Sequence, residues 1–228
     1  ILLSTTLLFV SFSIGASYES AQRKLARGAA GSATVSVTAV NGGIDIGIIP
    51  ELPGIRTVAG VMEGSALYHE NGYYETVDLI AADLNQLSKI NPPRLANGGG
   101  ITDFIGNQVI LPDRFTSKYK IETGDAITLQ IEGKTVSLEV AEIAAYDTIF
   151  LRHTRGATAL VPLATLSGLL GSTEGYTKIL IEPAEGTSTA DLKNELAAML
   201  PDGEYRVSEV VNEAQVSADA RQKSMPFF

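Results

Sequence analysis

The residues of this chain whose types suit chemistry are few and scattered. Its two histidines, His69 and His153, lie far apart, and apart from Glu70 neither has a His, Asp or Glu neighbour at metal-ligand spacing. Zinc sites and acid–base sites need several ligands that converge on one point. The chain has no cysteine, which excludes thiolate metal sites, thiol nucleophiles and disulfide bonds. We therefore interpret both histidines as exposed polar residues and predict no metal site.

One segment matches a catalytic motif. Residues 117–120, SKYK, fit the S-x-x-K pattern of serine acyl-enzymes, in which the lysine assists deprotonation of the serine. The companion motifs are missing, since residues 134–136 read KTV and lack the glycine of K-T-G. A four-residue pattern arises by chance in many chains. A serine hydrolase that uses Ser117 is therefore a weaker alternative.

The other candidate motifs favour structural roles. The run NGGG at 97–100 lacks the Lys-Ser/Thr of a phosphate-binding loop and is interpreted as a linker. Glu139 and Glu142 lie on predicted strands or turns without a shared cleft, so a paired-carboxylate hydrolase is unsupported. Three tyrosines of one predicted hairpin form an exposed contact patch or pack against a sheet: Tyr68, Tyr73 and Tyr74. The sequence thus predicts no catalytic, cofactor-binding or metal-binding residue, and no cofactor.

Composition narrows the class of protein. The 228 residues are 45% hydrophobic, and 26 acidic against 17 basic residues give a formal net charge of −9. A chain of this length can bury a sizeable core as one large domain or two small ones. Nucleic-acid binding needs clustered Lys and Arg, so an acidic chain argues against a nucleic-acid partner.

The first segment is apolar. Residues 1–18 contain no charged side chain. A membrane-spanning helix needs about 20 apolar residues, so this run suits the outer part of such a helix if apolar residues precede it. A signal peptide without its basic start, or an ordinary buried helix, are the alternatives. We predict that residues 1–27 hold the end of a transmembrane helix followed by a helical stalk.

The last segment has the same character. Apolar residues recur at three- and four-residue spacing over 208–223, which predicts a helix with Ser208 as its N-cap, and residues 225–228 read MPFF. We predict that residues 207–228 form a second stalk leading to a second transmembrane helix. Basic residues beside both ends oppose the positive-inside preference, which weakens for long translocated domains.

The body of the chain divides into three parts. Residues 28–90 are predicted to hold a strand at 34–39 and a hairpin of strands 55–68 and 73–84 around the turn Asn71-Gly72. Residues 91–171 begin with a flexible Pro- and Gly-rich passage and continue as a β-rich subdomain. Residues 172–206 are predicted as strand, helix and strand.

In the β-rich part, predicted strands lie at 109–111, 126–131, 135–146, 148–151 and 159–161, with short helices at 113–119 and after Pro162. This pattern favours a small barrel or sandwich. The strand–helix–strand unit of the last third is expected to pair with the strands of 34–84. The fold class is therefore predicted as α+β: an α/β layer from the first and last thirds, carrying a β-rich inserted subdomain and flanked by helical stalks.

The order of these parts resembles a known family. The telling pieces are a strand and a short helix followed by K-x-x-x-G-D-x-I-T-L, here Lys120 to Leu129, then a hairpin and later a helix that begins Val161-Pro162-Leu163. With the flanking apolar ends, this resembles the MacB-like extracytoplasmic domain of FtsX-like ABC transporter permeases, which lies between their first and second membrane helices. The resemblance covers essentially the whole chain, and its motifs are structural rather than catalytic.

The resemblance implies a porter-like α/β layer, a location in the plasma membrane with this domain on the extracytoplasmic side, and no enzymatic activity of its own. It implies an ATP-binding-cassette partner subunit, a second permease copy in a homo- or heterodimer, and export, release or mechanotransmission driven by ATP. An extracytoplasmic protein partner is also expected. The alternative from another class is a signal-anchored or secreted binding module without a transporter.

Overall fold

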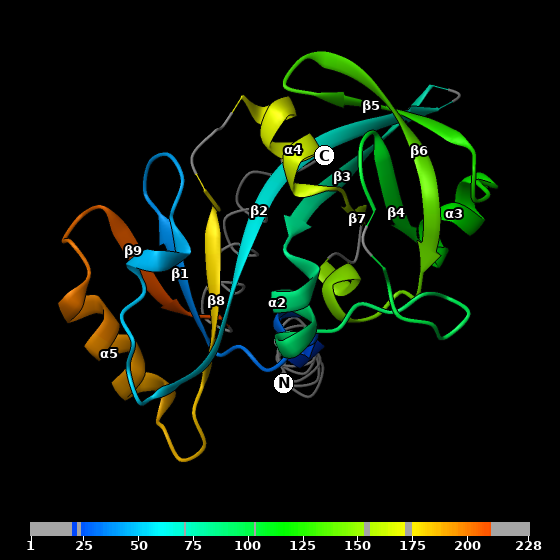
Figure 1. The fold of residues 1–228 in the computed structure, drawn as a ribbon. Helices are drawn as coiled ribbons and strands as arrows, with labels where there is room; N and C mark the ends of the chain where they lie inside the picture. Colours follow the sequence, from blue (N-terminus) through cyan, green and yellow to red (C-terminus); the bar gives the residue numbers. More distant parts are fainter. Residues whose placement is uncertain are drawn as a thin grey trace, which may run out of the picture.

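The computed structural model describes residues 20–21, 24–70, 72–102, 104–152, 156–171 and 175–210. Helices and strands combine in an α+β fold with a mixed sheet, as Figure 1 shows. The strands are β1 (Val35–Ala39), β2 (Ile55–Glu70), β3 (Tyr73–Ala82), β4 (Gln108–Pro112), β5 (Ala126–Ile131), β6 (Lys134–Ala144), β7 (Ala157–Leu160), β8 (Lys178–Pro183) and β9 (Tyr205–Glu209). The helices are α2 (Leu84–Ile90), α3 (Asp113–Tyr119), α4 (Leu163–Leu170) and α5 (Thr189–Met199), with 3₁₀ turns η1 (Ile46–Ile48) and η2 (Thr148–Arg152). Residues 20–21 and 24–30 are also helical.

The β-rich half is a closed barrel. Its strands follow the order β3-β7-β4-β6-β5-β2, and an additional pairing of β2 with β3 closes the ring. Each strand contributes buried side chains to one interior cluster, among them Met62, Leu79, Leu111, Leu129, Leu138 and Ala159. Closure leaves no free strand edge within the ring, and the shared apolar interior stabilises it. The predicted barrel or sandwich is therefore a barrel, but it needs β2 and β3 from the first third of the chain.

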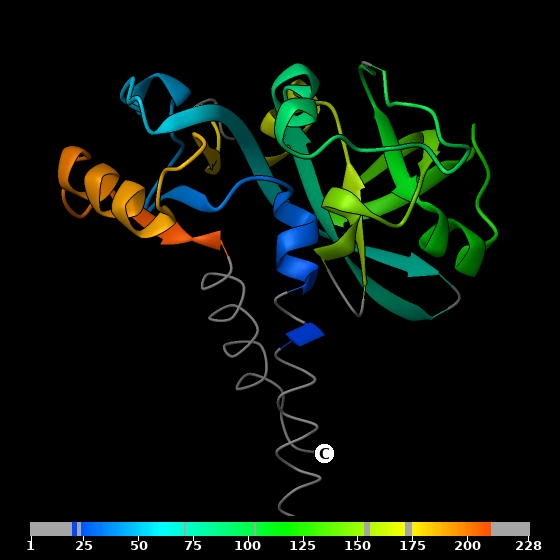
Figure 2. The ribbon, with the colours of Figure 1, turned by 90° about the horizontal axis from the view of Figure 1, so that it is seen from below.

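The second half is an open layer of β2, β8, β1 and β9 covered by α5. β8 and β9 both pair antiparallel with β1, so β8, α5 and β9 form the predicted strand–helix–strand unit. Ser188 caps α5, since its side chain accepts a hydrogen bond from the backbone N–H of Asp191. Leu192 and Leu196 of α5 are fully buried against the strands. The two halves lie side by side in Figure 2.

Strand β2 belongs to both halves. It is 16 residues long; its positions 55–61 pair with β8 and its positions 61–70 pair with β3. Gly60 allows this arrangement, because a Cβ there would lie 2.3 Å from the ring of Tyr176. A continuous strand thus joins the layer to the barrel.

Several sequence predictions differ from the structure. The expectation that strands 34–84 pair with the last third is confirmed for β1 and the start of β2, but it is wrong for β3, which pairs with β2 and β7. Residues 148–151, predicted as a strand, form the 3₁₀ turn η2. Helix α2 was not predicted; Asp83 caps it, its side chain accepting from the N–H groups of Asn85 and Gln86. Ser208 lies in β9 opposite Ser36 and is no helix cap, while residues 211–228 lie outside the described residues.

The passage at 91–100 is tied to the barrel. Arg94 pairs with Gly100 and Leu95 with Ala144 in isolated bridges, and the Arg94 guanidinium forms an ion pair with Asp147. The backbone N–H of Ala96 donates to the carbonyl of Ile143 at 2.9 Å. The passage is therefore hydrogen-bonded to strand β6 and to the turn that follows it.

Candidate functional site at the base of the domain

The helix of residues 24–30 ends against α2. Gly31 stops the helix with a φ of 65°, and a Cβ at this position would lie 2.2 Å from the carbonyl oxygen of Ile90. The side-chain amide of buried Asn91 donates to the carbonyl oxygens of Gly28 at 3.1 Å and Ala29 at 2.7 Å. These are terminal helix carbonyls that have no partner within the helix. The sequence at 31 and 91 thus fixes how the entering helix meets the domain.

The leaving chain meets the domain beside the entering chain. The backbone N–H of Val210 donates to the carbonyl oxygen of Thr34 at 3.0 Å, and the N–H of Thr34 donates to Ile181 at 3.1 Å. The hydroxyl groups of Thr34 and Thr189 lie 2.9 Å apart in a further hydrogen bond. Residues 24–34, the start of α5 and the end of β9 therefore form one hydrogen-bonded junction, which we call the base.

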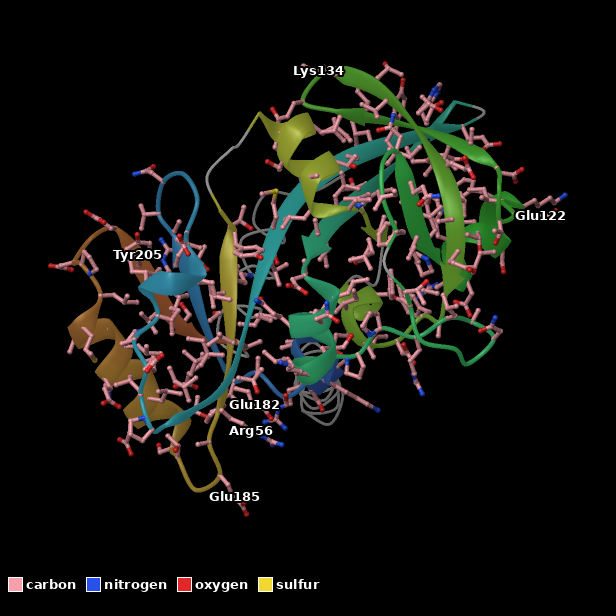
Figure 3. All side chains as sticks on the ribbon, viewed as in Figure 1. Arg56, Glu122, Lys134, Glu182, Glu185 and Tyr205 are labelled. Carbon is pink, nitrogen blue, oxygen red and sulfur yellow. The ribbon has the colours of Figure 1, made fainter. Side chains whose placement is uncertain are left out.

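Ion pairs brace the layer above the base. Arg56 of β2 and the nearly buried Glu182 of β8 lie 3.2 Å apart, and Figure 3 shows their side chains next to each other. Lys178 of β8 and Glu63 of β2 form a second pair at 3.4 Å across the same two strands. Because β8 lies between β2 and β1, these contacts help to hold the long strand to the base.

The end of the β2–β3 hairpin carries a second polar cluster. The hydroxyl of Tyr68 donates to the carboxylate of Glu70, and the carboxylate of Glu75 accepts from both Lys118 and Tyr119 of α3. The ring of Tyr68 meets Tyr119 edge-on, with ring centroids 4.8 Å apart, and it meets Phe115 at 5.1 Å. This cluster holds α3 against the hairpin.

Burial changes the acid–base properties of this cluster. Burial, and then the hydrogen bond to Glu70, raise the pKa of Tyr68 far above its ordinary value. Burial and the bond to Glu75 also raise the pKa of Tyr119, and the bond to Glu75 raises the pKa of Lys118. Each shift favours the protonated form, so the cluster stays intact at neutral pH. A tyrosine whose pKa is raised stays protonated at neutral pH and cannot accept a proton there. We therefore assign this cluster a structural role.

The opposite face of the hairpin is exposed. His69 and Tyr74 lie opposite each other in the register, and their rings stack with centroids 4.4 Å apart. Tyr74 is 67% exposed. Of the three predicted tyrosines, Tyr68 therefore packs inward and Tyr74 belongs to an exposed patch; the structure does not describe the side chain of Tyr73.

The structure gives no support to the serine motif. Ser117 is exposed on α3, and Lys120 follows the helix in a left-handed conformation with a φ of 56°. Among the described residues no hydrogen bond joins Ser117 to Lys120, and Lys118 is bound to Glu75. An acyl-enzyme needs its serine in contact with a base, and that contact is missing here.

The remaining candidates stay apart. His153 lies outside the described residues. The run at 97–100 is a turn in which the Asn97 side chain accepts from the N–H of Gly99 at 3.0 Å. Glu139 and Glu142 lie on β6 and pair with strand β4. In the part of the chain that the structure describes, no three acidic or histidine side chains gather as a metal site would require.

Sequence reasoning missed the residues of the base. Asn91 appears in the sequence only as the residue before two prolines, and no local signal links it to Gly28, 63 positions earlier. The pairing of Tyr68 with Glu75 is different, because a two-residue turn at 71–72 sets this register. The sequence is therefore sufficient to place Glu75 opposite Tyr68, but it does not predict the contact of Glu75 with α3.

Comparison with known proteins identifies the fold. No family model and no curated protein sequence match the chain. The periplasmic region of MacB from Actinobacillus actinomycetemcomitans superposes with a TM-score of 0.54 at 11% identity, over 87% of this chain and 96% of that one. The extracellular domain of the noncanonic ABC-type transporter YknZ from Gram-positive bacteria gives 0.47 at 15% identity, over 77% and 100%. A permease domain from Porphyromonas gingivalis gives 0.46 at 15%, over 78% and 89%.

The likeness to the MacB region extends over most of both chains. Helices that span a membrane are not found among the described residues, and the two predicted apolar ends, 1–18 and 225–228, lie outside them. The predicted resemblance to the MacB-like extracytoplasmic domain is confirmed at the level of the fold: the chain has the fold of the MacB periplasmic region.

Proposed function

We propose that this chain is the extracytoplasmic domain of an ABC transporter permease subunit of the MacB/FtsX-like type. In this proposal it couples ATP hydrolysis by a cytoplasmic partner subunit to export, release or mechanotransmission at the outer face of the membrane. The domain has no enzymatic activity and needs no cofactor. It lies between two membrane helices, on the extracytoplasmic side of the plasma membrane.

One observation carries the proposal. The chain enters and leaves the domain through Thr34 and Val210, which are joined by a 3.0 Å hydrogen bond within a fold shared with the MacB periplasmic region. Two flanking segments that meet at adjacent residues suit an insertion between consecutive membrane helices. They also suit mechanical coupling, because any separation of the two segments strains the hydrogen bonds of the base.

The domain boundaries follow from this scheme. We propose the end of a transmembrane helix and a stalk at 1–27, and an α/β subdomain from 28–90 and 172–206. Residues 91–171 form a linker and a β-rich insertion, and residues 207–228 form a stalk that leads to a second transmembrane helix. The described residues modify its details, because β3 lies in the barrel and positions 207–209 belong to β9. In the proposed mechanism, β2 transmits motion from the base to the barrel, since it runs unbroken through both.

The flexible passage that the sequence predicts at the start of residues 91–171 is the alternative coupling element, since a flexible passage there would act as a hinge. The bridges and the ion pair that tie this passage to β6 and Asp147 favour β2 as the coupling element. Partners in this proposal are the ATP-binding subunit, a second permease copy, the membrane, and an extracytoplasmic protein; nucleic acid is not among them.

The experiment that tests the proposal is affinity purification of the tagged full-length protein from detergent-solubilised native membranes. A co-purifying ATP-binding-cassette subunit is the expected result. If the protein is soluble, or leaves the membrane without an ATPase, the secreted or anchored binding module becomes the better interpretation. Ser117→Ala addresses the hydrolase alternative: any hydrolytic activity that disappears with this substitution alone would revive it.

A further inference from the structure

We propose that the exposed end of the β2–β3 hairpin rests on the outer surface of the lipid bilayer that anchors the chain. This inference rests on the proposed function, which places the membrane beyond residues 20–21. The hairpin end is defined here as residues 67–70 and 72–76, with helix α3 packed against it.

Position is the first argument. Figure 2 shows the helix of residues 24–30 leaving the domain on its lower side, and the end of the hairpin lies on that same side with α3 beside it. Helix α2 lies on the opposite side of the molecule. A membrane reached by the helix of residues 20–30 is therefore also the surface that the hairpin end approaches.

The chemistry of the hairpin is the second argument. Its outward face carries Leu67, His69, Tyr74 and Thr76, all exposed and none of them acidic or lysine or arginine. Leu67 is 40% exposed and Tyr74 is 67% exposed. Tyrosine is enriched where a protein meets the headgroup region, because its ring is apolar and its hydroxyl remains hydrated. In a chain with 19% charged residues, an exposed uncharged face with an aromatic ring at its tip suits that environment.

Charge on the neighbouring helix is the third argument. Arg114 and Lys120 are exposed on or just after α3, beside the hairpin, while the exposed Lys118 is paired with Glu75. The two hairpin carboxylates nearby are engaged by protein donors, Glu70 by Tyr68 and Glu75 by Lys118 and Tyr119. Basic side chains next to a membrane-facing aromatic attract lipid phosphates. The shared ligand chemistry is thus the phosphate headgroup layer, with Tyr74 at the boundary of the acyl chains.

The rigidity of the contact is the fourth argument. The hairpin end is braced by the three aromatic rings of Tyr68, Phe115 and Tyr119. A hairpin held in this way transmits a vertical force into the barrel instead of bending. The contact would give the barrel a support at a distance from the base, so that motion of the flanking helices tilts the domain about two points.

The absence of tryptophan makes a direct test possible. The 228-residue chain is reconstituted into vesicles of phosphatidylcholine and phosphatidylglycerol that carry a spin-labelled, fluorescence-quenching lipid. Three single-tryptophan variants are compared: Tyr74→Trp at the hairpin, Ala21→Trp on the entering helix, and Ser88→Trp on α2. All three positions are exposed, and Tyr74→Trp keeps an aromatic ring opposite His69.

The expected result is lipid quenching and a blue-shifted emission for Tyr74→Trp, together with an unquenched Ser88→Trp. A Tyr74→Trp variant that emits as in water overturns the hairpin contact. In that case Ala21→Trp shows whether the hairpin contact alone fails or the proposed function fails with it. Quenching at position 21 supports the membrane anchoring of the proposed function. Equal quenching at 74 and 88 also overturns the proposal, since it means that the whole domain adsorbs to lipid without orientation.

Discussion

The backbone N–H of Val210 donates a 3.0 Å hydrogen bond to the carbonyl oxygen of Thr34. These residues are 176 positions apart, and they lie near the two ends of the described part of the chain. The first strand of the layer and its edge strand are thereby registered at the base, since Val35 pairs with Glu209 in the next step of the ladder.

Asn91→Ala is expected to destabilise the domain. The substitution leaves the carbonyl groups of Gly28 and Ala29 without their side-chain donor in a buried position, which costs about 1–3 kcal/mol. Urea denaturation measures this loss as a lower midpoint at unchanged slope. The matched control is Asn85→Ala, an exposed amide on the same helix, which should change stability by less than about 0.5 kcal/mol. Equal effects of the two substitutions would contradict the capping role of Asn91.

Gly31→Ala should cost more than the backbone conformation alone explains. A left-handed conformation costs a non-glycine residue about 1–2 kcal/mol. Gly133→Ala measures the conformational cost alone, because the φ of Gly133 is 74° and nothing lies within 4 Å of the added Cβ. At Gly31 the Cβ also meets the Ile90 carbonyl at 2.2 Å, so the helix or α2 must shift. Parallel denaturation of both variants checks this, and a loss at Gly31 no larger than at Gly133 would argue against a tight junction.

Stability should fall at alkaline pH through Tyr68. Its pKa is raised in the folded state, so above the ordinary value of about 10 the folded protein holds a proton that the unfolded chain releases. The contribution is fully present below about pH 10 and is lost as pH rises further. The stability advantage of the wild type over Tyr68→Phe should therefore narrow above that pH. Denaturation from about pH 8 to about pH 11 measures it, with exposed Tyr74→Phe as the control that keeps the wild-type slope.

Cross-linking the passage at 91–100 to the barrel should leave coupling intact. Leu95 of the passage lies opposite Ala144 of β6 in a β-bridge, so Leu95→Cys with Ala144→Cys places two thiols at a backbone spacing that a disulfide can span. If β2 transmits motion, ATP hydrolysis by the purified permease–ATPase complex is the same before and after oxidation. A loss that reduction restores would place the hinge in this passage and reject β2 as the coupling element. The two single-cysteine variants control for the substitutions.

The extent of sequence prediction follows from how local each signal is. The β2–β3 hairpin, the pairing of β5 with β6 and helix α3 all depend on neighbouring residues, and all three are found as predicted. The partner of β3 is wrong because alternation along a strand says which face is buried but not which strand lies beside it. Nothing in the sequence indicates that β2 belongs to both the open layer and the barrel of one continuous sheet.

The sequence predicts less of the candidate site than of the fold. The base depends on contacts between positions such as 28 and 91 or 34 and 210, and single-sequence patterns carry no information on such distances. The patch at the hairpin end was easier to predict, since the sequence places three tyrosines there. Their division into an inward and an outward face needed the strand register and the position of α3.

The closed ring has a consequence for how copies of this domain associate. Each described strand of the barrel has a partner on both sides, so none of them offers a neighbour an edge that is free along its whole length. Of the described strands only β9 has a single partner, and Arg206 and Glu209 place charges on that edge. Among the described strands, only this short, charged edge is open along its whole length, and its charges disfavour edge-to-edge aggregation of the folded protein.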